Sequence, residues 1–375
     1  MLNKNKIVVA AGLSLLTSLF TVSTWADTSQ KALVKGHEYL AVTNYPDNLH
    51  LIDVATDKVY KTCNMPGQFG PGTVSISPDK KRAYVLGNGF RQVYGFDLDT
   101  CKLEFNAVFA QAANEDARAM FSFAVSADGK ELYSVNNAVH KSIDHYTIQQ
   151  PRLQVFSTDG GVNAKPIRSF PAPRQVYIMQ AADDGSLYMA GPDIYKVNVQ
   201  DGSYTVAIPS RNWKRENYGQ PDVLYFWPHQ QVNRDFSILY TAPKFTDASQ
   251  NLETAEYKYG FFNVNLATGE TETKDFGDVV EIYFTGQRSP KEPNLMYGLL
   301  NRLTKYDIEK QELLQAQELD HTYYNLHFST NGDKIYLVGT LNDISIHDAQ
   351  TLEKTGSISL PGGDMAITTA QVFIR

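Results

Sequence analysis

The sequence predicts an all-β chain that folds as a seven-bladed β-propeller, with the ring closed by the C-terminal strand completing the first blade. Three observations predict this fold. Short apolar runs follow a period near two instead of a helical period, one turn motif recurs seven times, and the first repeat lacks a strand that the C-terminus can supply. Aromatic residues make up 12% of the chain, with 22 Tyr and 19 Phe, which suits half-buried strands.

The first 26 residues differ from the rest of the chain. Lys4 and Lys6 precede an apolar run, Ile7–Phe20, and Thr24-Trp25-Ala26 resembles a signal-peptidase site. We therefore expect residues 1–26 to be a secretory signal peptide and residues 27–375 to form one propeller domain in the periplasm; an uncleaved membrane anchor is the alternative. No later apolar run approaches about 18 residues, so we expect no membrane contact by the mature chain.

The first repeat, Tyr39–Pro66, is predicted to contain three strands. Leu40 and Val42 belong to the first strand, residues 49–54 form the second and residues 59–63 the third. Turn-forming residues, 46–48 and 55–57, separate them.

A turn motif at the end of a strand counts the repeats. An apolar residue precedes Asp, Asn or, once, Ser, and Thr or Gly usually follows within a few residues. The seven turns begin at Asp53, Asp97, Ser157, Asn198, Asn265, Asp307 and Asp348. Subtracting these positions gives four spacings of 41 to 44 residues and two longer ones, 60 and 67, and a repeat of this length is typical of a propeller blade. Because these polar residues recur at turns, we expect them to be structural and not catalytic.

A second polar turn precedes an apolar strand in most repeats. Ser77-Pro78-Asp79 precedes residues 82–86, and Ser329-Thr330-Asn331-Gly332 precedes residues 335–337. We expect both to be hairpin turns, since Gly and Asn tolerate positive φ and Asp forms local hydrogen bonds.

The two ends of the chain complement each other. Residues 365–374 form a strand left over after the seventh repeat, and a propeller that does not close leaves two open sheet edges. We therefore expect Met365–Ile374 to complete the first blade; a linear array with an unpaired tail is the alternative.

Cys63 and Cys101 are the two cysteines of the chain. An oxidising compartment favours a disulfide between them, and two separate buried thiols are the alternative. Neither belongs to a C-x-x-C-H motif, so the chain attaches no c-type haem by that route.

Composition and motifs restrict the chemistry. The formal charge of −7 argues against nucleic acid as a partner. The sequence contains no Gly-rich dinucleotide or phosphate loop and no G-x-S-x-G. His140 and His145 are the closest pair of histidines in a predicted loop; we expect no metal, with a dispersed zinc or calcium site as the alternative.

Two insertions lie where binding residues are usually found, on loops held by a rigid scaffold. One is Asn137–Pro151, and the other region contains Arg211–Gln231 and Ala242–Tyr257. Aromatic residues dominate interface hot spots, so these insertions are predicted to meet a partner or to line a substrate cavity, with ordinary packing or solvated loops as the alternative. The candidate residues are Trp213, Tyr218, Tyr225, Phe226, Trp227, His229, His140, His145 and Tyr146.

The first repeat resembles that of the YVTN-type β-propellers at Val42-Thr43-Asn44, Leu51-Ile52-Asp53 and Ala55-Thr56, together with the turn at residues 77–79. The run from Tyr39 to Phe109 and the overall layout further resemble the β subunit of quinohaemoprotein amine dehydrogenase. This second resemblance covers essentially all of the mature chain.

The resemblance implies a periplasmic heterotrimer that oxidises primary amines to aldehydes and ammonia and passes electrons to a soluble carrier. A haem-bearing α subunit carries two c-type haems, and a quinone-bearing γ subunit carries cysteine tryptophylquinone. The β subunit is a seven-bladed propeller that binds no redox cofactor, supports the quinone subunit and helps to wall the cavity for the amine, so no catalytic residue is expected in this chain. The alternatives are a stand-alone periplasmic propeller that binds a protein or ligand, and a propeller hydrolase or lyase with metal or histidine in its channel.

Overall fold

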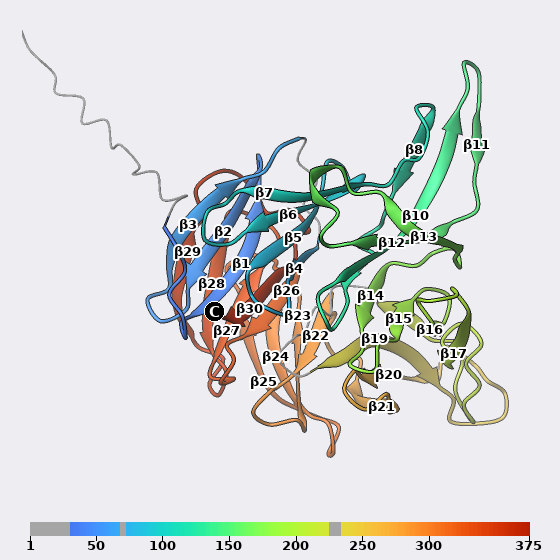
Figure 1. The fold of residues 1–375 in the computed structure, drawn as a ribbon. Helices are drawn as coiled ribbons and strands as arrows, with labels where there is room; N and C mark the ends of the chain where they lie inside the picture. Colours follow the sequence, from blue (N-terminus) through green and yellow to red (C-terminus); the bar gives the residue numbers. More distant parts are fainter. Residues whose placement is uncertain (1–30, 68–72, 225–233) are drawn as a thin grey trace, which may run out of the picture.

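The structure is a computed structural model that describes residues 31–67, 73–224 and 234–375. These residues form seven antiparallel sheets arranged as the blades of a ring (Figure 1). Within the described ranges the one helical element is a 3-10 turn, η1 (Gly161–Asn163), and no helix is long and apolar enough to cross a membrane. The protein is therefore a seven-bladed β-propeller, as predicted.

The first blade combines both ends of the chain. Its strands are β1 (Glu38–Asn44), β2 (Asn48–Asp53), β3 (Lys58–Asn64) and β30 (Ala370–Ile374). The order across the sheet is β3-β2-β1-β30.

The other blades are formed by consecutive strands. The second contains β4 (Val74–Ile76), β5 (Arg82–Gly87), β6 (Gln92–Asp97) and β7 (Leu103–Val108). The third contains β8 (Glu115–Arg118), β9 (Phe123–Val125), β10 (Glu131–Lys141), β11 (Tyr146–Ile148), β12 (Arg152–Ser157) and β13 (Pro166–Pro171). The fourth contains β14 (Ile178–Ala181), β15 (Leu187–Ala190), β16 (Ile194–Val197) and β17 (Tyr204–Ile208).

The last three blades follow the same order. The fifth contains β18 (Asp222–Leu224), β19 (Asp235–Lys244), β20 (Glu256–Asn265) and β21 (Thr271–Asp278). The sixth contains β22 (Thr285–Arg288), β23 (Leu295–Leu299), β24 (Arg302–Asp307) and β25 (Glu312–Glu318). The seventh contains β26 (Asn325–Phe328), β27 (Lys334–Val338), β28 (Asp343–Asp348) and β29 (Lys354–Ser359).

The C-terminal strand closes the ring, as predicted. β30 pairs antiparallel with β1, so that Tyr39 lies opposite Phe373 and Val42 opposite Ala370. The strand is shorter than the predicted Met365–Ile374. Met365 N donates to Leu341 O, and Thr368 N donates to Met365 O, so the preceding segment turns instead of extending the sheet.

The repeated polar turns are structural, as predicted. Asp53 Oδ1 accepts hydrogen bonds from Ala55 N at 2.8 Å and Thr56 N at 3.3 Å, and Asp348 Oδ1 makes the equivalent bonds in the seventh blade. The other five turns show the same side-chain bond to a backbone N–H two or three residues ahead, at Asp97, Ser157, Asn198, Asn265 and Asp307.

In the sixth and seventh blades, a buried tyrosine on the strand next to the innermost one reaches the turn between the two outer strands of the next blade. Tyr297 Oη donates to Ala349 O at 2.8 Å, and Tyr336 Oη donates to Asp57 Oδ1 at 2.7 Å across the closure between the seventh and first blades. Both side chains are fully buried, so each ring packs between blades while its hydroxyl keeps a partner.

The predicted disulfide is present. Cys63 on β3 is bonded to Cys101, which follows the turn after β6, with a Cα–Cα distance of 5.2 Å. It joins the outer strand of the first blade to the second blade.

Candidate functional site

The ring has two faces that differ in their connections. We number the strands of each blade from the centre of the ring outward, and neighbouring strands run in opposite directions. Two kinds of connection therefore lie on the same side of the ring: the one between the second and third strands, and the one to the next blade. We call this side the hairpin face. The turns at Asp53, Ser77 and their counterparts lie on the opposite side, the turn face. The described parts of the predicted insertions lie on the hairpin face. Residues 137–151 join β10 to β12, residues 242–257 join β19 to β20, and residues 211–221 lie in the connection from β17 to β18, whereas residues 225–231 lie outside the described residues.

The insertion at 137–151 is a projecting β-hairpin (Figure 1). The far half of β10 pairs with β11 on one side and with β8 on the other. His140 therefore lies in a strand, opposite Thr147 and Glu115, and Tyr146 begins β11, while His145 lies in the turn. The prediction of a loop at His140 and Tyr146 was wrong, because β8 provides a pairing partner that the repeat pattern does not contain.

Charged side chains fix the base of this hairpin. Glu115 forms an ion pair with Arg152 and lies 3.8 Å from Nε2 of His140. Asp116 accepts a hydrogen bond from Arg91 Nε at 2.8 Å and pairs with Lys141 Nζ at 3.2 Å. The bonds from Arg91 hold the pKa of Asp116 well below its ordinary value. These pairs orient the hairpin relative to the ring.

The end of the hairpin exposes apolar side chains. Ile143 is fully exposed, and Tyr146 and Ile148 are about 70% exposed. Tyr146 and Ile148 are two residues apart in β11 and therefore project from the same side of the strand. Apolar groups gathered on a projecting hairpin are typical of a protein-contact surface.

A second feature of this face is the aromatic loop, residues 209–221, between β17 and β18. Trp213 stacks on Tyr218 with 5.8 Å between ring centroids, and it meets Tyr240 edge to face at 4.8 Å. The loop is attached to the extension of β19, since Gly219 N donates to Pro243 O at 2.9 Å. Trp213 and Tyr218 are half-buried, so they pack on the fifth blade and keep part of each ring on the surface.

Asp275 on β21 anchors this loop. Its carboxylate accepts two hydrogen bonds from Arg215, at 2.7 and 3.0 Å, and one each from the hydroxyls of Tyr218 and Tyr240. Burial opposes ionisation of Asp275, but the bonds from Arg215 and the two tyrosines outweigh it, and the pKa lies below its ordinary value. The sequence reasoning missed Asp275 and Arg215, because only the fold brings β21 to the aromatic loop.

A cavity of about 290 Å³ lies beside the aromatic loop on the same face. Arg211 and Gln220 of the loop line it together with Gln175 and Tyr177, which precede β14. Arg211 Nη2 donates to Gln175 Oε1 at 3.2 Å across this junction of the fourth and fifth blades.

The structure brings together Trp213 and Tyr218 but places His140, His145 and Tyr146 on the separate hairpin of the third blade. Tyr225, Phe226, Trp227 and His229 lie outside the described residues. Among residues 31–67, 73–224 and 234–375, no group of three or more His, Cys, Asp or Glu side chains is placed to hold a metal ion.

Comparison with known proteins supports the fold. No protein-family model matches the chain, and no curated protein sequence matches it. The chain is similar in structure to hydrazine synthase of Kuenenia stuttgartiensis, at a TM-score of 0.53 and 12% identity over 82% of this chain and 90% of that one. It is also similar to apo AztD from Citrobacter koseri, at a TM-score of 0.51 and 12% identity over 90% and 99%, and to the dihydro-heme d1 dehydrogenase NirN, at 0.50 and 11% over 92% and 76%.

Proposed function

We propose that the chain is the β subunit of a periplasmic quinohaemoprotein amine dehydrogenase, which oxidises primary amines to aldehydes and ammonia. In this proposal the propeller carries no redox cofactor. A quinone-bearing γ subunit docks on the hairpin face, where the propeller helps to wall the amine cavity, and a haem-bearing α subunit completes the heterotrimer. The observation that carries the proposal is that the projecting apolar hairpin, the aromatic loop and a cavity share this face.

The hairpin suits a docking element. The ion pairs at its base restrict its orientation. Full burial of each exposed apolar side chain by a partner would stabilise the complex by about 1.5 to 3 kcal/mol. A pre-oriented hairpin also loses little conformational freedom on binding, which favours affinity.

The aromatic loop suits the wall of a cavity. Asp275 fixes the hydroxyl of Tyr218 and the guanidinium of Arg215, and Trp213 stacks against the same unit. Rigid aromatic walls at a subunit junction exclude water and hold a small amine in one orientation, which is how residues without a chemical role increase rate.

The disulfide supports two parts of the proposal. A bond between Cys63 and Cys101 favours an oxidising compartment, as the periplasm is. Both sulfur atoms are occupied, so neither cysteine fits a tryptophylquinone cross-link or a haem thioether. This supports placing the quinone and the haems on partner subunits. The structural similarity to a haem d1 dehydrogenase supports only the use of such a propeller in redox proteins.

Affinity purification from the native periplasm tests the proposal. We expect the tagged chain to carry with it a c-type haem spectrum and a small quinone-bearing chain. Replacing Ile143 and Ile148 together with Asp is expected to weaken this association at least tenfold without changing the thermal midpoint. Ile167→Asp, on the outer strand β13 of the same blade and 52% exposed, is the matched control and should retain both partners. A colourless single chain from the unmodified strain would contradict the proposal and favour a stand-alone binding propeller.

A further inference from the structure

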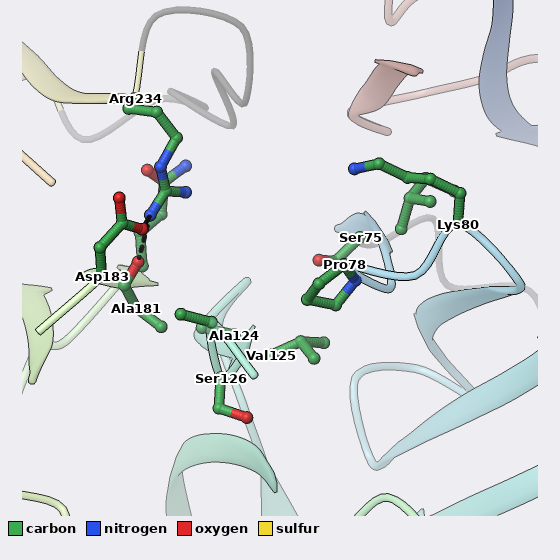
Figure 2. A pocket seen from close by; sticks show the side chains of 12 residues that line it. Ser75, Pro78, Lys80, Ala124, Val125, Ser126, Ala181, Asp183 and Arg234 are labelled. Atoms are coloured by element: carbon green, nitrogen blue, oxygen red, sulfur yellow. Dashed lines mark hydrogen bonds and ion pairs between the residues drawn. The ribbon is translucent and has the colours of Figure 1, made fainter. Parts of the chain in front are cut away.

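A second cavity, of about 250 Å³, opens on the turn face, opposite the proposed docking surface. Figure 2 shows this cavity from close by. The ends of β4, β9 and β14 and the turns that follow them form its walls. Its lining comprises Ser75, Ile76, Pro78, Lys80, Ala124, Val125, Ser126, Ala127, Gln180, Ala181, Asp183 and Arg234. The cavity thus gathers side chains from four consecutive blades.

Two cationic side chains lie on opposite walls of this cavity (Figure 2). Figure 2 shows the Lys80 side chain extending from one wall in the direction of Arg234 on the other. Arg234 Nη2 pairs with Asp183 and donates to Ala181 O at 3.3 Å. Within the described part of the chain, Lys80 Nζ has no hydrogen bond or ion pair.

The surroundings of Lys80 disfavour its charge. Burial, together with the nearby guanidinium of Arg234, lowers the pKa of Lys80, and the adjacent Asp79 only partly opposes this. Lys80 is also only partly exposed. An anion between Lys80 and Arg234 would relieve the repulsion between these two groups.

The backbone position of Lys80 is unusual for a residue with a side chain. In the equivalent turns, Ser77, Ser126 and Ser329 each accept the N–H of the residue that starts the next strand. Three residues after the serine, two of these turns have glycine, Gly129 and Gly332, both with φ of 75°, whereas the first has Lys80 with φ of 61°. A left-handed backbone conformation costs energy for a residue with a Cβ, and glycine avoids this cost. In the second blade this position is nevertheless occupied by Lys80, whose side chain lines the cavity.

We propose that this cavity binds a short aliphatic monocarboxylate, whose carboxylate lies between Lys80 Nζ and the Arg234 guanidinium. A carboxylate beside Lys80 Nζ would supply the acceptor that this ammonium lacks within the described residues, and a charge-assisted bond is stronger than a neutral one. Ala124, Val125 and Ala181 provide apolar wall for the alkyl chain. At about 30 Å³ for each water-sized group, the volume accommodates roughly eight such groups, which fits an acid the size of butyrate.

Calorimetric titration of the mature protein with sodium butyrate tests this site, with butylammonium chloride as the probe of opposite charge. We expect saturable binding of butyrate and none of butylammonium. Lys80→Gln should weaken butyrate binding at least tenfold, Lys80→Arg should retain it within a few fold, and Lys81→Gln, at the neighbouring exposed lysine, should leave it unchanged. Circular dichroism checks that each variant is folded.

A second measurement does not depend on variants. Acylation of the lysines followed by peptide mass spectrometry should show that butyrate protects Lys80 and not Lys81. Equal affinity in the unmodified protein and in Lys80→Gln, binding of butylammonium, or the absence of saturable butyrate binding would each overturn the proposal. None of these results depends on the amine dehydrogenase assignment.

Discussion

Deletion of residues 365–375 is expected to abolish the stable fold, because this segment supplies the closing strand of the ring. The deletion removes the buried side chains of Met365, Val372 and Phe373, and it exposes the edge of β1 along the five residue pairs that join it to β30. It also removes two acceptors from the second blade. Thr369 Oγ1 accepts from Val74 N and Gln371 Oε1 from Ile76 N, both at 2.8 Å.

The structure gives the size of this effect. Three large apolar side chains at 1.5 to 3 kcal/mol each amount to about 5 to 9 kcal/mol. Two buried N–H groups left without acceptors cost about 2 to 6 kcal/mol more. The total is comparable to the whole free energy of unfolding of a typical domain, about 5 to 15 kcal/mol, so the truncated chain should not remain folded.

Two point variants test the contribution of the closing strand without shortening the chain. Gln371→Met keeps the side-chain length and removes the acceptor of Ile76 N, and we expect a loss of about 1 to 3 kcal/mol in urea unfolding followed by tryptophan fluorescence. Ile374→Ala, on the same strand but 46% exposed, is the control and should change the free energy of unfolding by about 0.5 kcal/mol or less. Equal thermal midpoints for the truncated and full-length proteins would refute the closure by β30.

Three further predictions concern stability. The double variant Cys63→Ala/Cys101→Ala should lower the free energy of unfolding by about 3 to 4 kcal/mol, since the bond closes a segment of 38 residues; an unchanged urea midpoint would contradict this. Burial lowers the pKa of His50 to about 4, whereas the ordinary value in the unfolded chain is near 6.5. The unfolded state therefore takes up a proton first as the pH falls from 6.5 toward 4, and the free energy of unfolding should decrease by about 3 kcal/mol over this range. His50→Gln should flatten this part of the pH profile of unfolding. Asp275→Asn removes the charged partner of Arg215, whose side chain is 35% exposed, and should cost about 1.5 to 3 kcal/mol at neutral pH, measured by urea unfolding. Because the folded pKa of Asp275 is lowered, the difference from the unmodified protein should shrink as the pH falls through and below the ordinary carboxyl range.

The fold could be predicted because its main signals are local. Each turn that begins at Asp53 or a counterpart is specified by a side chain that bonds to the backbone two or three residues ahead, so the repeat can be counted from sequence alone. The closure also followed from the sequence, since one repeat lacked a strand and one strand remained. The start of that strand could not be predicted, because Met365 bonds to Leu341 in another turn.

The site could be predicted only in outline. The positions of residues 137–151, 211–221 and 242–257 on one face follow from strand order, but the hairpin depends on pairing with β8, which lies outside the repeat. Asp275 sits on an outer strand and resembles any exposed carboxylate in sequence; its role depends on Arg215, about sixty residues earlier. Lys80 and Arg234 likewise belong to turns of different blades, and only the ring places them at one cavity.

Depletion of amine dehydrogenase activity is the most direct test of the proposed function. A periplasmic extract of the native host is passed over resin that captures the tagged chain, and amine-dependent dye reduction is measured in the bound and unbound fractions. We predict that the activity leaves the extract with the chain and is recovered on the resin together with haem absorbance. Activity that stays in the unbound fraction after the chain has been completely removed would contradict the assignment.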